Sequence, residues 1–376
     1  MIRYFTYRLI LLVALIVCGC TGMKNISSND PLYIGAKIQF EGKDADTKKL
    51  TPIAKSVLKP NANNTFLWMR PAVARNNMLS AKAKKKKFWK NKISGPVLLS
   101  QTNPLQTSAT IQNRMFHNGY FKSKVTYDTL FISNRKVKYN YTIALDEPYR
   151  FESITFPKSN SDLIQKINAS QSESLLKKGD IYSLEAVKNE RIRIDGSLKE
   201  QGYIFFNPEF IKVRADTLTG DQQVNAEVIV KPETPPESRR PYTIGKVFIH
   251  DDHTLDNTLT DTLEFDRYYL ISQHKALRIQ TVQQGIFLKP GDLYSRSNYL
   301  QTIRYMNELP IIRNTNIKFL PKGDTDTLDM FLYLSQRKRY AYSAEFNAIF
   351  RSTNYFGPGM IFSYSDRNKN KGAELL

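Results

Sequence analysis

Only two of the 376 residues are cysteines, and both, Cys18 and Cys20, lie near the N-terminus. No downstream segment can therefore form a disulfide, which excludes a small disulfide-stapled module and a cysteine-ligated zinc site. Histidine is also scarce, with four residues scattered along the chain. The sequence has no Gly-x-Ser-x-Gly, Walker or His-Glu-x-x-His motif. We predict that the protein is not an enzyme and uses no cofactor.

Two acidic stretches resemble metal sites but lack the context that such sites require. His250-Asp251-Asp252-His253 directly follows a predicted strand and has no helical context, which favours a polar turn. Asp324–Asp329 resembles the start of a calcium-binding EF-hand loop. It lacks the glycine at the sixth position, and the twelfth position is Ser335 instead of glutamate. We therefore predict no metal site.

The N-terminus has the pattern of an export signal. Arg3 and Arg8 precede Leu9–Val17, a run of nine residues without a polar side chain. This run is shorter than the ~20 residues that a membrane-spanning helix needs. It ends at Val17-Cys18-Gly19-Cys20, which resembles a bacterial lipobox. We predict a lipoprotein signal peptide and lipid attachment at Cys20; an ordinary signal peptide with incidental cysteines is the alternative.

The chain is strongly basic, with 55 Lys and Arg against 35 Asp and Glu and a net charge of +20. In an exported protein this excess does not indicate nucleic acid as a partner, and we predict none. Much of it lies in one run, Lys82–Lys92, in which Phe88 and Trp89 interrupt seven lysines. Such a run can lie on anionic lipid headgroups with its aromatic side chains at the interface. A solvated basic insertion is the alternative.

An internal repeat organises the middle of the chain. Gly179-Asp180-Ile181-Tyr182-Ser183 opens a segment with apolar residues at helical spacing, which ends at Gly202-Tyr203. Gly95 and Gly119-Tyr120 hold the same positions earlier, at offsets of 179 − 95 = 84 and 202 − 119 = 83 residues. The two copies therefore have nearly the same length.

A third copy opens with Gly291-Asp292-Leu293-Tyr294-Ser295 and has Leu309-Pro310-Ile311-Ile312 in place of the Gly-Tyr pair. Its offset of 291 − 179 = 112 residues predicts an insertion around Asp251–Thr281.

Each copy predicts the order strand, helix, helix, strand, strand. Ser100, Ser183 and Ser295 suit the N-caps of helices, because serine accepts a hydrogen bond from a free amide of the first turn. Gly119 and Gly202 suit the left-handed position just past a helix end. This order predicts small α+β modules in which helices cover one face of a three-stranded sheet. The edge strands of such a sheet keep unpaired backbone groups.

From Tyr340 the pattern changes to a period of two. Tyr340–Arg351 alternates apolar with mostly polar residues, and its length suits a transmembrane β-strand of ~9–11 residues. Gly357-Pro358-Gly359 predicts a turn, and Met360–Ser365 then alternates again. A soluble amphipathic hairpin would have the same pattern.

A transmembrane barrel must close, and the smallest bacterial barrels have ~8 strands. Residues 339–376 number only 38. We therefore predict either a fragment that stops just inside a barrel or a hairpin that belongs to the last module.

Four stretches occur along the chain in the same order as in a known protein family: Leu58–Asn63 with Gly95-Pro96-Val97, Glu190–Arg193 leading to Gly202-Tyr203, Lys289–Ser295, and Arg367–Glu374. Together they resemble the POTRA-plus-barrel outer-membrane assembly factors of the BamA/TamA superfamily, and most closely the lipid-anchored TamA-like (TamL) branch. Arg367–Glu374 resembles a strand start found early in the barrels of this family. The third module departs from the family by lacking its Gly-Tyr pair.

The resemblance implies a non-enzymatic role at the bacterial outer membrane, with a lipid anchor and soluble modules in the periplasm. POTRA modules of the family receive unfolded or partly folded outer-membrane client proteins and pass them to the barrel. The implied partners are these clients, outer-membrane lipid and a periplasm-spanning protein. Exposed sheet edges suit this role, because an incoming strand can pair with them by β-augmentation. A dedicated secretion pore of the same superfamily and a barrel-less periplasmic scaffold are the alternatives.

The predicted fold class is α+β, with tandem POTRA-like βααββ modules followed by the first strands of an incomplete transmembrane β-barrel. The predicted organisation is a signal peptide (1–19), module 1 with a basic insertion near 82–92 (20–148), module 2 (149–240), module 3 (241–338) and the start of the barrel (339–376).

Overall fold

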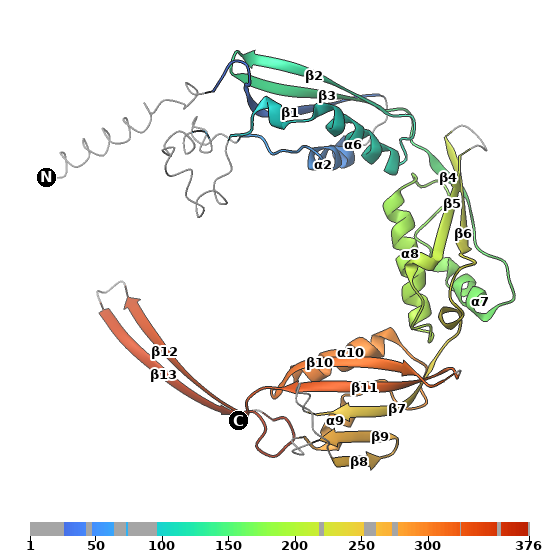
Figure 1. Ribbon diagram of the computed structural model, residues 1–376, viewed down its shortest axis with the longest axis vertical. Coiled ribbons are helices and arrows are strands. Elements are labelled where there is room, and N and C mark those ends of the chain that lie inside the picture. The colour runs from blue at the N-terminus through green and yellow to red at the C-terminus, as the bar shows by residue number, and fades with distance from the viewer. Residues whose placement is uncertain are drawn as a thin grey trace. The chain divides into compact units, whose positions relative to one another are not determined.

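The computed structural model describes residues 26–42, 47–63, 73, 96–217, 222–251, 261–272, 277–323, 325–351 and 355–374. For 261, 349–351 and 355–356 it describes the backbone alone. In this part of the chain the predicted α+β class is confirmed, because short helices pack on small sheets (Figure 1). The described residues form two compact units. The first contains those up to Ser153 together with 177–186 and 216–225, and the second contains the others.

The first sheet has three strands, β1 (Leu32–Glu41), β2 (Lys124–Ser133) and β3 (Lys136–Ala144), in the order β1-β3-β2. The central strand β3 is parallel to β1 and antiparallel to β2. Every second side chain of β3 is buried. Helices α2 (Thr47–Ser56) and α6 (Pro104–His117) cover that face and complete its core (Figure 1).

The predicted helix cap at Ser100 is wrong. Helix α6 begins after Asn103, whose side-chain oxygen accepts a backbone N–H of the first turn at 3.0 Å, and Pro104 occupies its first position. Proline suits that position because its missing N–H would have no helical partner there. Ser100 instead donates its hydroxyl to Asp30 at 2.8 Å.

The second sheet has the order β4-β6-β5, formed by β4 (Arg150–Thr155), β5 (Ile211–Asp216) and β6 (Gln223–Val230). Helices α7 (Asp162–Ala169) and α8 (Leu184–Lys199) contribute leucine and isoleucine side chains to its core. The glycines past the helix ends are left-handed as predicted, with φ of +90° at Gly119 and +94° at Gly202.

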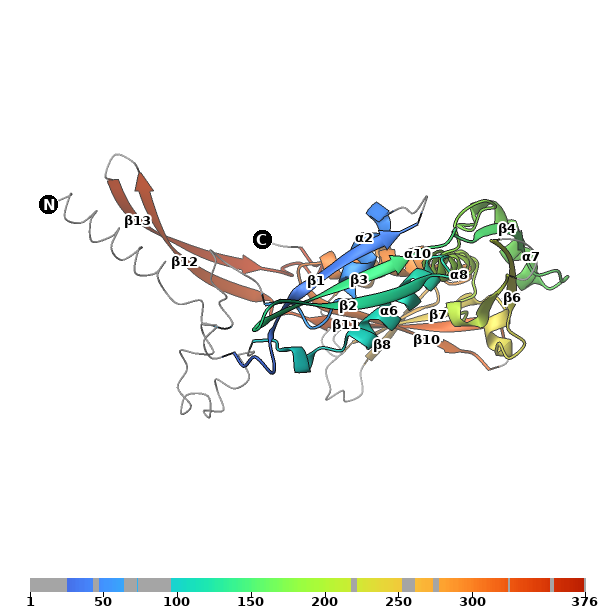
Figure 2. The ribbon, with the colours of Figure 1, turned by 90° about the horizontal axis from the view of Figure 1, so that it is seen from above.

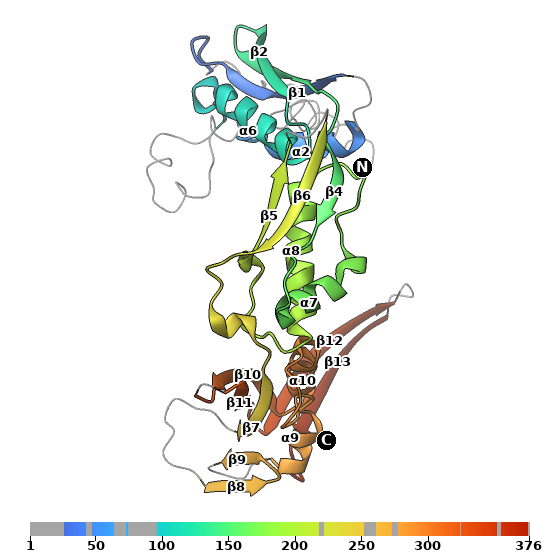
Figure 3. The same ribbon diagram turned by 90° about the vertical axis from the view of Figure 1, so that its right-hand side faces the viewer.

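The third sheet has five strands instead of the predicted three. Its order is β10-β11-β7-β9-β8, and its strands are β7 (Thr243–His250), β8 (Asp261–Phe265), β9 (Tyr268–Ser272), β10 (Ile312–Pro321) and β11 (Thr327–Gln336). Strands β8 and β9 come from the predicted insertion and extend the sheet beyond β7 (Figure 3). They join it because Tyr268, Leu270 and Ser272 are buried alternately and continue the core face of β7.

Two helices pack on the third sheet, α9 (Ile279–Gln284) and α10 (Arg296–Glu308). They contribute the fully buried Val282 and Met306 to its core. The predicted cap at Ser295 is confirmed, because its side chain accepts the backbone N–H of Asn298.

Strands β12 (Tyr340–Arg351) and β13 (Tyr355–Asp366) form a two-stranded antiparallel sheet (Figure 2). The predicted turn at Gly357-Pro358-Gly359 is wrong, because these residues lie within β13 and Pro358 is opposite Ala348. A two-stranded sheet leaves one edge of each strand open, and proline is tolerated at an edge where no partner needs its N–H. The remaining described elements are the short 3₁₀ helices Leu99–Gln101, Gln171–Glu173, Pro208–Phe210 and Pro236–Arg239.

Candidate functional site

The predicted lipid-attachment residue Cys20 and the basic run Lys82–Lys92 lie outside the described residues, and both stay predictions. Asp252 and His253 of the stretch His250–His253 also lie outside the described residues. His250 ends β7 and stacks on Tyr333, with ring centres 4.7 Å apart. Across the described ranges, no three His, Cys, Asp or Glu side chains gather as a metal site. No described helix has both the length and the apolar character needed to cross a membrane.

The outer edge of β2 is open, because β3 pairs with one side of the strand and no described strand pairs with the other. Near its end, Leu130, Phe131 and Ile132 are 43%, 64% and 58% exposed. Open backbone groups beside three consecutive exposed apolar side chains allow another extended chain to add a strand. The edge of β2 is therefore a candidate docking surface for polypeptide.

The other sheet edges differ in how far they are protected. Strand β8 is open and exposes Leu263 and Phe265. The edges of β5 and β10 carry the exposed cations Lys212, Arg214, Arg313 and Lys318, and charged side chains on an edge disfavour added strands. The outer sides of β1 and β4 are covered in part by the chain that leads into the second helix, through hydrogen bonds from Tyr33 N–H to Val97 O (3.0 Å) and from Phe151 N–H to Asp180 O (2.9 Å).

The β12–β13 hairpin has an aromatic face. Cross-strand pairs such as Tyr342 with Tyr364 and Ala344 with Phe362 place these side chains together, since residues directly opposite each other share a face. Its large members are half to four-fifths exposed: Tyr340, Tyr342, Phe346, Met360, Phe362 and Tyr364. The other face pairs Ser343 with Ser363. Each strand has 12 residues, which is enough to cross a membrane as a tilted strand of ~9–11 residues.

An ion pair closes the base of the hairpin, and the segment after it contacts the core of the third sheet. Arg339 donates two hydrogen bonds to the carboxylate of Asp366, at 2.8 and 2.7 Å. The chain beyond β13 then folds back, with Arg278 N–H donating to Lys371 O at 3.0 Å and Ala373 buried in the third core. Arg367–Glu374, which resemble a strand start of the family, form turns and bends in the structure, with φ of +60° at Lys371 and +59° at Ala373.

The Gly-Tyr pairs hold the start of the next repeat. Tyr149 N–H donates to Gly119 O at 2.8 Å, and the carbonyl of Tyr149 accepts Tyr182 N–H at 2.8 Å. In the same way, Tyr242 N–H donates to Gly202 O at 3.0 Å and its carbonyl accepts Tyr294 N–H at 2.9 Å. Sequence reasoning assigned the glycines to helix ends and missed this junction. The available signal was the Pro-Tyr pair at Pro148-Tyr149 and Pro241-Tyr242.

A carboxylate from the second repeat caps a helix of the third. The side chain of Glu200 accepts hydrogen bonds from the Ser295 hydroxyl at 2.7 Å and from the Ser297 N–H and hydroxyl at 3.0 and 2.8 Å. These groups lie at the N-terminus of α10, where free amides and the helix dipole favour negative charge. Gly202 and Glu200 therefore join the second and third repeats within the second compact unit.

Two buried carboxylates on α8 differ in the direction of their pKa shift. Burial by itself raises the pKa of Glu190. Two hydrogen bonds from Arg193 (3.0 and 2.8 Å) and one from Leu175 N–H (2.8 Å) together lower the pKa by more than burial raises it, so the net shift is downward. For Asp195, burial outweighs the ion pair with Lys199 (2.9 Å), and its pKa is raised. Glu190 and Arg193 therefore form a structural ion pair.

No protein-family model and no curated relative matches the chain. Among solved structures, POTRA3–5 of BamA from Haemophilus influenzae is 12% identical with a TM-score of 0.40, and the match covers 83% of this chain and 99% of that one. POTRA1–3 of Omp85 from Anabaena is 10% identical with a TM-score of 0.26, covering 82% and 96%. CdiB from Acinetobacter baumannii is 11% identical with a TM-score of 0.27, covering 61% of this chain and 38% of CdiB.

Proposed function

We propose that this chain belongs to an outer-membrane protein assembly or translocation factor. Its periplasmic modules receive client chains by β-augmentation and hand them to a membrane β-barrel that begins with the β12–β13 hairpin. The role is non-enzymatic. The observation that carries the proposal is the combination of open sheet edges with a hairpin whose exposed aromatic face is long enough for a bilayer.

The open edges support the client-receiving step. Main-chain groups are the same in every polypeptide, so a strand added at β2 gains hydrogen bonds whatever its sequence. The exposed Leu130, Phe131 and Ile132 offer apolar contacts that an unfolded chain can match. A surface of this kind accepts many clients at modest affinity, as an assembly factor requires.

The hairpin supports the membrane step. Its aromatic face would meet lipid and its serine-rich face would meet the barrel interior, in the apolar-out and polar-in alternation of membrane β-strands. We propose the predicted division into modules at 20–148, 149–240 and 241–338, with residues 339–376 as the start of the barrel. The partners are unfolded or partly folded outer-membrane proteins, outer-membrane lipid and a periplasm-spanning protein, with no nucleic acid.

Depletion of the protein in the cells that make it tests the function. An assembly factor predicts that the amounts of several outer-membrane β-barrel proteins fall together, measured by quantitative mass spectrometry of outer membranes. Loss of one exported protein with normal barrels would instead identify a dedicated secretion pore. Unchanged barrels and unchanged export would leave a periplasmic scaffold and contradict the proposal.

The lipid anchor at Cys20 completes the proposed location in the outer membrane. Substitution Cys20→Ala should abolish palmitate labelling, and globomycin should block processing of the wild-type protein. Unchanged palmitate labelling of the variant would refute the anchor and leave the assembly function untouched.

A further inference from the structure

Strand β8 exists because of the insertion in the third repeat, and it forms an edge that the other two sheets lack. It pairs antiparallel with β9, and no described strand lies on its other side (Figure 3). Thr262–Phe265 are all exposed. The outer N–H and C=O groups of β8 are therefore available to an extended chain.

The core face of the sheet continues onto β8 without a cover. Leu263 is opposite Leu270, and Phe265 is opposite Tyr268. Leu270 and Tyr268 are 1% and 4% exposed, whereas Leu263 and Phe265 are 41% and 49% exposed. A strand added to β8 would extend this face and remove both apolar side chains from water, which favours binding.

The edge of β8 also lacks lysine and arginine, the residues that protect the edges of β5 and β10. Asp261–Phe265 contain no lysine or arginine, in contrast to the cationic edges of β5 and β10. The carboxylate of Glu264 is engaged by the hydroxyl of Tyr269, at 2.7 Å. The cationic side chains that protect the edges of β5 and β10 are therefore absent from β8.

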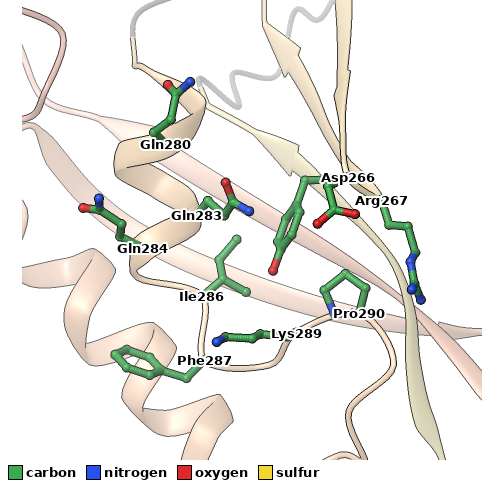
Figure 4. Close-up of a pocket in the computed structure, with 10 residues that line it drawn as sticks. Asp266, Arg267, Gln280, Gln283, Gln284, Ile286, Phe287, Lys289 and Pro290 are labelled. Carbon is green, nitrogen blue, oxygen red and sulfur yellow. The ribbon is translucent and has the colours of Figure 1, made fainter.

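A pocket of about 640 Å³, lined by both polar and apolar residues, lies at the end of β8 (Figure 4). One wall is the β8–β9 turn, where Asp266 and Arg267 have φ of +45° and +64°. The facing residues come from α9 and from the segment that follows it: Gln280, Gln283, Gln284, Ile286, Phe287, Lys289 and Pro290. A strand on β8 would lead directly to this pocket.

The polar side chains of the pocket are not used within the described protein. No hydrogen bond or ion pair joins the side chains of the three glutamines, Arg267 or Lys289 to another described residue. A glutamine amide offers one donor group and one acceptor, which match those of a peptide bond. The lining residues include two cations, Arg267 and Lys289, and one carboxylate, Asp266. A second carboxylate, Asp292, lies beside the pocket and accepts the Lys289 backbone N–H at 3.2 Å. A carboxylate on the ligand can pair with either cation.

We propose that β8 and this pocket form one docking site for an extended peptide segment with apolar side chains at alternate positions and an acidic residue beyond them. The segment adds a strand to β8, its apolar residues cover Leu263 and Phe265, and its acidic residue pairs with Arg267 or Lys289 at the pocket. The inference rests on the proposed function, in which the segment belongs to an incoming client chain.

Binding of synthetic peptides to the full chain tests the site. The probe is a fluorescein-labelled peptide of alternating valine and threonine with two aspartates at one end, measured by fluorescence anisotropy. Leu263→Lys should weaken its binding about tenfold or more, because a lysine replaces an apolar contact on the edge. Leu320→Lys is the matched control, since Leu320 is also an exposed leucine, on the opposite edge strand β10 of the same sheet. It should bind the probe as the wild type does.

Two further measurements separate strand addition from side-chain attraction. N-methylation of alternate peptide amides should abolish binding in one register and leave it unchanged in the other, because every second N–H of an added strand faces β8. Arg267→Glu should reverse the preference between probes ending in two aspartates and two lysines. The peptide series uses the wild-type protein, so it is informative even where a variant folds poorly.

Equal binding by wild type and Leu263→Lys, or equal effects of both methylation registers, would overturn the proposal. A dimer of the chain that sedimentation shows to be lost in Leu263→Lys, with no peptide binding, would also overturn it and identify the edge as a self-interface. Depletion tests the client function in cells, whereas peptide binding tests the site in solution. A failure of one is therefore distinguishable from a failure of the other.

Discussion

At the residue scale, charged and conformationally special side chains hold the repeats together. The buried Glu190–Arg193 pair lies inside a stretch that the sequence singled out for its family resemblance, and its role in the structure is stabilisation. Arg193 and Glu190 are 14% and 0% exposed at their side chains, so removal of one partner leaves the other buried without its charge partner.

Glu190→Gln should lower the free energy of unfolding by about 3 kcal/mol at neutral pH. Because the folded pKa of Glu190 is lowered, its contribution is present above the unfolded pKa of about 4.3 and is lost as pH falls through the folded pKa. The difference between wild type and variant should therefore shrink on acidification. Urea unfolding at several pH values measures it. Asp195, whose pKa is raised, is present in both proteins, so its contribution to the pH dependence of stability drops out when the two unfolding free energies are subtracted. A difference that is constant down to pH 3 would contradict the assignment.

Gly202→Ala should destabilise the protein by about 1–3 kcal/mol. Its φ is +94°, and an added Cβ would lie 2.8 Å from Leu293 Cδ1. Gly196→Ala is the matched control, because Gly196 lies in α8 with nothing within 4 Å of an added Cβ. Alanine in a helix interior should stabilise by about 0.5–1 kcal/mol. Thermal unfolding followed by circular dichroism compares the two, and equal effects would refute the junction role of Gly202.

At the element scale, edge strands that are alike in the sequence pattern differ in the side chains that they expose. The edges of β5 and β10 carry two exposed cations each, whereas β8 carries none and β2 has one, Lys124, far from its exposed Leu130–Ile132. The hairpin is a third case, since its exposed aromatic groups lie on a face instead of an edge.

Phe346→Asp in the hairpin should weaken association of the full chain with lipid vesicles several-fold, because it places a charge on the face proposed to meet lipid. Ser343→Asp places the same charge on the opposite face and should have little effect. Both positions are exposed, so folding should be preserved. Flotation of the protein with vesicles measures the association. Equal loss in the two variants would argue against a lipid-facing aromatic surface.

At the scale of the whole molecule, the repeats are joined by recurring contacts as well as by the chain. In both junctions the carbonyl of the left-handed glycine past the helix end contacts the following Pro-Tyr pair, which in turn contacts the Gly-Asp-x-Tyr-Ser segment. Glu200 adds a side-chain contact between the second and third repeats.

A double-mutant cycle with Glu200→Ala and Ser297→Ala should give a coupling energy of about 1 kcal/mol in the free energy of unfolding, because one carboxylate caps the first turn of α10. Ser197→Ala is a suitable control partner, since Ser197 is absent from the Glu200 contacts. Chemical denaturation of the four proteins yields the cycle. Additive effects of Glu200→Ala and Ser297→Ala would show that the cap does not stabilise the junction.

The sequence by itself determined the elements whose signals are local. The left-handed Gly119 and Gly202, the cap at Ser295 and the alternation of Tyr340–Arg351 depend on residues close together in the chain, and the structure confirms them. The position of the insertion was likewise visible as extra length before Gly291.

Tertiary structure decided what depends on distant partners. The insertion became strands β8 and β9 because β7 offered an edge for them, and Pro358 stayed within β13 because Ala348 pairs opposite it. The cap moved from Ser100 to Asn103, and Ser100 took Asp30 as a partner 70 positions away. The spacing of residues in the sequence predicts which side chains share a face of one helix or strand. Which strand edges stay open depends on the pairing of strands from remote parts of the chain, and spacing does not predict that.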